Sequence, residues 1–142
     1  MKLDNIGQRH KLIEDMIKKA FEFEEGLIHD QENDNDWGGA MSTIEYLNVI
    51  EEMIRTEGIF MDTFAEMADM RSHNLDDKET YLSIVDDSWV SFIDTVLLRR
   101  IELAFDHLNE WPFQSAGGKK FQKNFCKKLD ELRKKYQDIY DL

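Results

Sequence analysis

Four polar residues interrupt the hydrophobic faces of otherwise amphipathic segments, and they are the strongest candidates for chemistry in the sequence. At 100° per residue, each projects with the apolar side chains of its own segment: Glu24, Glu57, Arg100 and His107. A charge inside a core has to be paired or neutralised. Because two carboxylates, a guanidinium and an imidazole are complementary in charge, we expect the four side chains to form one buried polar network.

Such a network has two interpretations, and the residue types alone do not choose between them. In the first, it is a structural set of salt bridges that fixes the register of the helices. In the second, it lines a pocket in which Arg100 grips an anionic ligand. Removing one partner of a buried ion pair costs about 3–5 kcal/mol, because the other charge is left stranded.

The composition predicts that helices position these residues. The chain has 142 residues, of which 42% are hydrophobic and 34% charged, with one Pro and seven Gly. This balance favours helices over strands and turns, and the length suits one domain. We expect an all-α, single-domain bundle of four long or five helices over residues 1–142. The helices are predicted at about 6–29, 42–70, 76–85, 87–110 and 119–142.

The segment 42–70 is predicted to be the central helix. Ser42 and Glu45 fit a capping box at its start, and Glu57 beside Gly58 suggests a bend. The preceding segment 30–40 (DQENDNDWGGA) is rich in Asp and Asn and closes with two glycines, so it is predicted to be a loop. Trp37 stands in that loop, either covering the core or serving as a binding anchor.

The formal net charge of −12 is unevenly distributed. Residues 1–77 hold 19 acidic and 7 basic side chains, whereas residues 78–142 hold 11 of each. Phosphate contacts need Lys and Arg, so direct binding of nucleic acid through the acidic part is disfavoured. A basic protein surface is the partner that this charge predicts, such as that of a nuclease or another nucleic-acid-binding protein.

These observations predict a non-catalytic acidic binding protein of the inhibitor or immunity type, as phages and mobile elements encode. It would block a nucleic-acid-binding surface by mimicking the charge and shape of a phosphate row. The expected contact residues are the outer acids of segment 42–70 and part of the preceding loop: Glu45, Glu51, Glu52, Asp62, Glu66, Asp69, Asp34, Asp36 and Trp37.

Two alternatives remain open. Glu22-x-x-Glu25 and Glu66-x-x-Asp69 are similar to the magnesium-binding motifs of the MazG-type helical nucleotide pyrophosphohydrolases, a resemblance limited to these two short motifs. It implies a magnesium-dependent enzyme that hydrolyses nucleotides. The other alternative is a helical scaffold protein that forms a homodimer through its amphipathic C-terminal helix, residues 119–142.

The remaining features predict neither catalysis nor a bound group. The chain has a single cysteine, Cys126, so an intrachain disulfide is excluded. Cys126 is predicted to be a small core residue. His10 lies among charged residues and is predicted to be on the surface. The sequence lacks the two Glu-x-x-His motifs of a di-iron bundle, so no catalytic residue, metal or cofactor is expected. Without an apolar run of membrane-spanning length or a secretory signal, a cytoplasmic location is expected and no membrane contact.

Overall fold

The chain forms a bundle of antiparallel helices, as the composition predicts. The computed structural model describes residues 6–27, 31–71, 89–140 and 142, and only the backbone of residues 6, 31–33 and 60–71. Its helices are α1 (Ile6–Glu25), α2 (Gln31–Arg71), the π-helical turn η2 (Ile93–Leu97), which leads directly into α4 (Leu98–Glu110), and α5 (Ala116–Tyr140). The described residues contain no β-strand, which confirms the all-α class.

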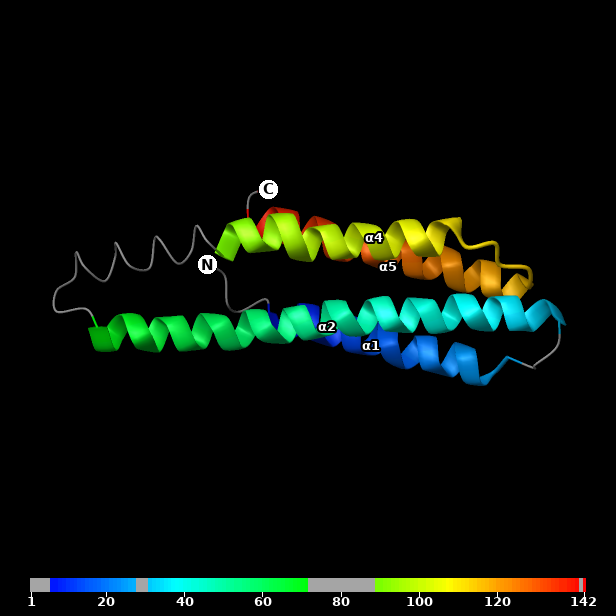
Figure 1. Ribbon diagram of the computed structural model, residues 1–142, viewed down its shortest axis with the longest axis horizontal. Helices are drawn as coiled ribbons and strands as arrows, with labels where there is room; N and C mark the ends of the chain where they lie inside the picture. Colours follow the sequence, from blue (N-terminus) through cyan, green and yellow to red (C-terminus); the bar gives the residue numbers. More distant parts are fainter. Residues whose placement is uncertain (1–5, 28–30, 72–88, 141) are drawn as a thin grey trace.

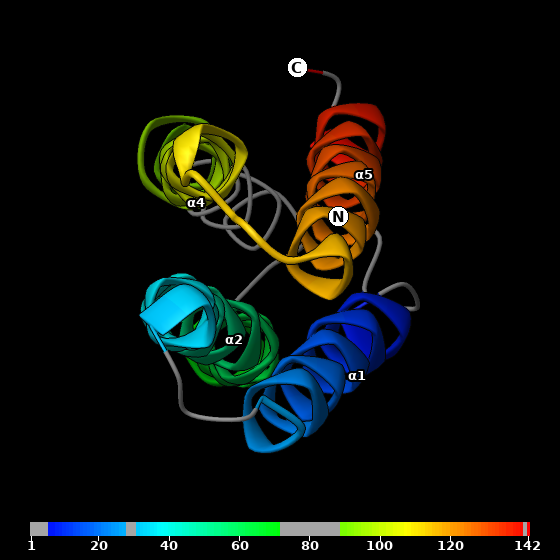
Figure 2. The same ribbon diagram turned by 90° about the vertical axis from the view of Figure 1, so that its right-hand side faces the viewer.

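The helices run side by side along one long axis (Figure 1). Seen end-on, α1 and α2 form one layer, and α4 and α5 form the other (Figure 2). α2 packs against α4 and α1 against α5 across the two layers, so that each helix has an antiparallel neighbour on two sides. α2 is the longest of the described elements, with 41 residues, and its C-terminal part extends beyond the start of α1.

The core lies where the apolar stripes of all four long segments meet. Buried positions in α1 and α5 recur at spacings of three and four residues, the period of one helix face. In α1 they are Ile13, Met16 and Ala20, and in α5 they include Phe121, Phe125, Leu129, Leu132 and Tyr136. Cys126 is buried there as well, as predicted. Because α5 uses its apolar face inside the bundle, its outer face is the polar one.

The prediction of a loop over residues 30–40 is wrong for residues 31–40, because α2 begins at Gln31 and includes all of them. Ser42 and Glu45 therefore lie inside the helix and do not cap its start, and the helix continues through Gly58. The two glycines have a packing role. A Cβ built on Gly39 would lie 2.6 Å from Trp111 Nε1 and 2.7 Å from Phe113 Cζ, so only glycine lets these rings approach the helix.

The segment that joins α4 to α5, residues 111–115, is hydrogen-bonded to the start of α2 and is called the link below. Asn35 donates a hydrogen bond to the Pro112 carbonyl at 2.8 Å, and Trp111 Nε1 donates one to the Asn35 carbonyl at 3.1 Å. The link follows α4 as expected, because α4 ends at Glu110, just before Trp111-Pro112. The predicted last helix begins earlier than expected, at Ala116, with Ser115 Oγ accepting a hydrogen bond from Gly118 N.

Two further features bear on the sequence predictions. The short helix expected at about 76–85 lies outside the described residues. None of the described helices combines the length and the apolar character needed to cross a membrane.

Candidate functional site

The buried ion pair of the bundle joins α1 to α2. Arg9 Nη1 donates hydrogen bonds to both carboxylate oxygens of Glu57, at 3.2 and 3.1 Å, and the two side chains are 1% and 0% exposed. Glu57 therefore interrupts its apolar stripe as predicted, but its partner is not one of the expected residues. Arg9 also lies over the ring of Tyr136, with Cζ 4.5 Å from the ring centroid.

Two tyrosines of α5 complete the coordination of Glu57. Tyr136 donates to one carboxylate oxygen at 2.9 Å, and Tyr140 donates to the other. Trp89 Nε1 donates to the Tyr140 hydroxyl at 3.3 Å, which ties the start of the α4 segment to the cluster. Burial and the nearby Glu57 carboxylate raise the pKa of both phenols far above their usual value, so both stay protonated donors.

Sequence reasoning missed Arg9, although the chain carries a signal for it. Arg9, Ile13, Met16 and Ala20 follow 4-3-4 spacing, which places the arginine on the buried stripe of α1. The 4-3-4 spacing of α5 places Tyr136 on the buried face of that helix, but it does not reveal the hydrogen bond that its hydroxyl donates to Glu57. The cluster of Arg9, Glu57, Tyr136 and Tyr140 holds three helices together and satisfies its own charges, which is the behaviour of a structural network.

The other three members of the predicted network lie elsewhere. Glu24 is half-buried and accepts a hydrogen bond of 2.6 Å from Trp37 Nε1. His107 packs between the rings of Tyr46 and Trp111, with centroid distances of 4.9 and 5.4 Å. Its Nε2 is buried with no hydrogen-bond partner among the described residues.

Arg100 is exposed, so the expectation that it is buried is wrong. It lines a pocket of about 290 Å³ between α2 and α4 together with Glu45, Tyr46 and Val49. A long cationic side chain at the edge of an apolar stripe can leave the core by extending along the surface, so that its charge stays hydrated.

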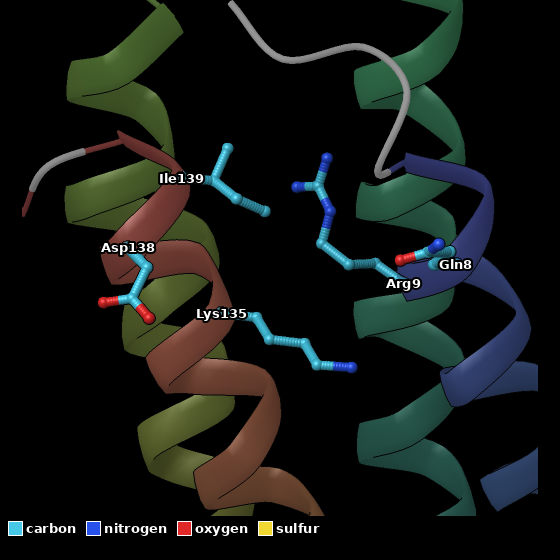
Figure 3. Close-up of a pocket in the computed structure, with 5 residues that line it drawn as sticks. All are labelled: Gln8, Arg9, Lys135, Asp138 and Ile139. Atoms are coloured by element: carbon cyan, nitrogen blue, oxygen red, sulfur yellow. The ribbon is translucent and has the colours of Figure 1, made fainter.

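A second pocket, of about 220 Å³, lies between α1 and α5, where Lys135 and Ile139 extend toward Arg9 (Figure 3). At this second pocket the positive charge of Arg9 is paired with the Glu57 carboxylate, 3.1 Å away.

Only part of the predicted acidic contact set is exposed. Asp34, Glu45 and Glu52 lie on the outer face of α2, and Trp37 is 36% exposed on the same helix. The outer face also carries two exposed apolar residues that the sequence predictions did not include: Val49, 43% exposed, and Ile59, 61% exposed. The side chains of Asp62, Glu66 and Asp69 lie outside the described residues.

Asp36 belongs to the fold and not to an exposed contact surface. It is 0% exposed and accepts hydrogen bonds from Gln114 N at 2.8 Å and from Ser115 N at 2.9 Å, as well as from Ser115 Oγ. Burial acts to raise the pKa of Asp36, but the hydrogen bonds from Ser115 and Gln114 outweigh it, so that the pKa lies below its usual value. The carboxylate thus anchors the start of α5 to α2.

Glu51 is buried, with 8% of the residue exposed, and its carboxylate contacts both Arg55 and His10. Arg55 Nη2 donates to its two oxygens at 2.7 and 2.9 Å, and His10 Nε2 lies 2.8 Å from Oε1. Burial acts to raise the pKa of Glu51, but the hydrogen bonds from Arg55 and His10 lower it further than burial raises it. His10 is half-buried between two carboxylates, since Nδ1 lies 2.8 Å from Glu14 Oε1. The expectation that His10 is a surface residue among charges is therefore incomplete.

The geometry does not bring together the two acidic motifs of the pyrophosphohydrolase alternative. Glu22 and Glu25 are exposed at the C-terminal end of α1, which adjoins the start of α2. Residues 66–69 lie near the other end of α2, roughly 50 Å further along the helix at 1.5 Å per residue. A single magnesium ion cannot bridge that separation.

Basic side chains gather on the side of the bundle where α1 meets α5. Lys19, Lys127 and Lys128 line a pocket of about 310 Å³ with Asn124 and Glu131 among its other walls. Burial and the adjacent Lys19 ammonium lower the pKa of Lys128. In the end-on view α5 lies diagonally opposite α2 (Figure 2). Because the exposed side of each helix points away from the middle of the bundle, the exposed lysines of α5 and the outer face of α2 lie on different sides.

Comparison of the chain with protein-family models, with curated proteins and with solved structures finds no match.

Proposed function

We propose that the protein is a binding protein without catalytic activity, which uses the outer face of α2 to cover a basic, nucleic-acid-binding surface of another protein. The observation that carries the proposal is the pairing of exposed carboxylates with exposed apolar side chains on one rigid helix. Asp34, Glu45 and Glu52 supply the charge, while Val49 and Ile59 supply apolar area.

This combination suits a specific interface better than a uniformly charged face does. Apolar side chains at the centre of an interface provide affinity by burial, and surrounding charges steer the encounter and select the partner. Val49 lies between Glu45 and Glu52 along the helix, within one turn of each. Trp37, further toward the start of α2, adds an aromatic side chain of the kind enriched in binding hot spots.

The distribution of charge over the bundle also favours α2 as the contact element. The basic side chains of α5 lie on a different side of the bundle from the outer face of α2. An approaching basic surface is therefore attracted to one side and repelled from the other, which orients the protein before contact. The partner is expected to be a protein with a basic groove of the kind that binds nucleic acid.

The test compares two charge-reversed double variants in capture experiments from the native host. The first carries Glu45→Lys and Glu52→Lys on α2, and the matched control carries Glu22→Lys and Glu25→Lys on α1, all at exposed positions. Proteins retained by the wild type are identified by mass spectrometry, purified and assayed for binding to DNA and RNA. The α2 double variant should lose a retained partner by at least tenfold in affinity, while the α1 control should keep it.

Added heparin or DNA should also release the partner from the wild-type protein, because a polyanion competes for the same basic surface. Equal losses in the two double variants would contradict a contact face on α2. A partner that stays bound in saturating DNA would contradict the blocking of a nucleic-acid-binding surface.

A further inference from the structure

We infer that His10, Glu14 and Glu51 form a binding site for a divalent transition-metal ion at the interface of α1 and α2. Each of the three offers one ligand atom, and these atoms lie within 4.8 Å of one another. The site is independent of the proposed contact face, since its side chains come from the α1–α2 interface and it requires no partner protein.

The helix geometry preorganises the three ligands. His10 and Glu14 are four residues apart on α1, so their side chains share one face of that helix. Glu51 reaches them from α2. The two carboxylates contact different ring nitrogens, since Nδ1 lies 2.8 Å from Glu14 Oε1 and Nε2 lies 2.8 Å from Glu51 Oε1. Bound to one ion at about 2.1 Å each, the ligand atoms would be roughly 3.4 Å apart in tetrahedral geometry. An ion held by Nε2 and Glu51 therefore requires Glu14 to turn from Nδ1 toward the ion, which closes the widest separation by up to about 1.4 Å. The Glu14 side chain is 55% exposed and has room to turn.

Arg55 competes with a metal ion for the Glu51 carboxylate, but it can also orient that carboxylate as a metal ligand. The guanidinium contacts both oxygens of Glu51 and is itself 59% exposed. It can keep its 2.9 Å hydrogen bond to Oε2 while Oε1 turns to the ion. A ligating carboxylate held by a hydrogen bond on its second oxygen is the usual arrangement around protein-bound metals.

The ligand types define the class of ion. One imidazole and two carboxylates suit Zn²⁺, Co²⁺, Ni²⁺ or Mn²⁺, whereas Mg²⁺ and Ca²⁺ prefer oxygen ligands alone. Three protein ligands leave at least one coordination position for water. Because the ligands come from two helices, a bound ion would link α1 to α2 and stabilise their packing.

The site is tested by calorimetric titration of the untagged, EDTA-treated protein with Zn²⁺ and Co²⁺. One equivalent should bind with a Kd in the micromolar range, Co²⁺ should give a visible d–d absorption, and Tm should rise by roughly 5 °C or more at saturation. Mg²⁺ at the same concentration should leave Tm unchanged.

Glu14→Gln is the first variant, because an exposed side chain can be changed without unfolding the protein, and His10→Gln is the second. Each should weaken Zn²⁺ and Co²⁺ binding by about tenfold to a hundredfold. Asp15→Asn, at an exposed carboxylate adjacent to Glu14, is the matched control and should bind as the wild type does. Binding that is unchanged in Glu14→Gln, or lost equally in Asp15→Asn, would overturn the site, as would a Co²⁺ complex without d–d bands.

Discussion

At the scale of single residues, the buried contact between Arg9 and Glu57 matters most for stability. The carboxylate is enclosed by one guanidinium and two phenols, each an effective hydrogen-bond donor. An ion pair of this kind need not add net stability over an apolar replacement, but its two halves depend on each other. Its main effect is therefore to penalise any packing of α1, α2 and α5 that separates Arg9 from Glu57.

Arg9→Met should lower the free energy of unfolding by about 3–5 kcal/mol, since Glu57 would be left buried without its cation. Urea denaturation followed by circular dichroism measures the loss. The double variant Arg9→Met with Glu57→Gln should recover part of it, because no charge is stranded and the amide oxygen still accepts hydrogen bonds from the tyrosines. Lys11→Met, an exposed substitution on the same helix, should change stability by about 0.5 kcal/mol or less. A loss in Arg9→Met no larger than in Lys11→Met would contradict the buried pair.

Cys126 provides a second test at this scale. Burial raises the pKa of its thiol to about 11. At pH 7 only a very small fraction is thiolate, which is the reactive form. The native protein should therefore react with a disulfide reagent such as DTNB at least about a hundredfold more slowly than the urea-unfolded chain, measured by absorbance at pH 7. Similar rates in the two states would show that this part of α5 is open to solvent.

At the scale of elements, the first three turns of α2 form one end of the bundle. Asn35 and Asp36 form hydrogen bonds with the segment that joins α4 to α5. Gly38 and Gly39 have no side chains, so that Trp111 and Phe113 of this segment can approach the helix. Residues that favour loops on average are used here for close approach and hydrogen bonding, inside a helix. The tertiary contacts thus override the local propensity of the segment.

Gly39→Ala should destabilise the protein by about 1–3 kcal/mol, because the new methyl group would overlap the rings of Trp111 and Phe113. Gly7→Ala in α1 is the matched control, since nothing lies within 4 Å of its added Cβ. It should stabilise the protein by up to about 0.5–1 kcal/mol through helix propensity. Thermal unfolding of the two variants measures both effects. A Gly39→Ala variant as stable as the wild type would contradict the packing of the link on α2.

The carboxylate of Asp36 should make stability depend on pH in the acidic range. Its pKa is lowered in the folded state from an ordinary value of 3.8, so its contribution is complete above that value. As the pH falls through the lowered pKa, the carboxylate is protonated and the contribution is lost. Asp36→Asn should cost about 1–3 kcal/mol at pH 7. The difference from the wild type, measured by urea denaturation, should shrink below pH 3.8. A difference that stays constant from pH 7 to pH 2.5 would contradict this role.

At the scale of the whole molecule, the separation of charge predicts how a partner associates. Long-range attraction between exposed charges is screened by salt, whereas short-range apolar contacts are not. The association rate constant for a captured basic partner should fall at least tenfold between roughly 50 and 500 mM NaCl, while the dissociation rate constant changes much less. Stopped-flow or surface-plasmon measurements separate the two. A salt-independent association rate would contradict steering by the acidic face.

The sequence determined the properties that depend on composition and periodicity. The all-α class, the apolar stripe of α5, the end of α4 before Trp111-Pro112 and the buried position of Glu57 follow from local patterns that tertiary contacts reinforce. Periodicity assigns a residue to a face of its own helix, but it does not say which residue of another helix lies opposite. Periodicity is therefore consistent with buried positions for both Glu57 and Arg9, but it does not show that the two side chains are partners.

Only the tertiary structure decided the rest. Glycines and Asp/Asn residues are compatible with either a loop or a helix start, and the choice at 31–40 depended on Trp111 and Phe113, more than 70 residues away in sequence. Arg100 and Glu51 likewise exchanged their expected environments. A long cationic side chain can reach solvent from the edge of a stripe, whereas Glu51 is held by His10 of α1 and Arg55 of its own helix. The environment of these charges therefore depended on where each side chain extends and on the partners that it reaches, which the pattern of apolar residues within one helix does not specify.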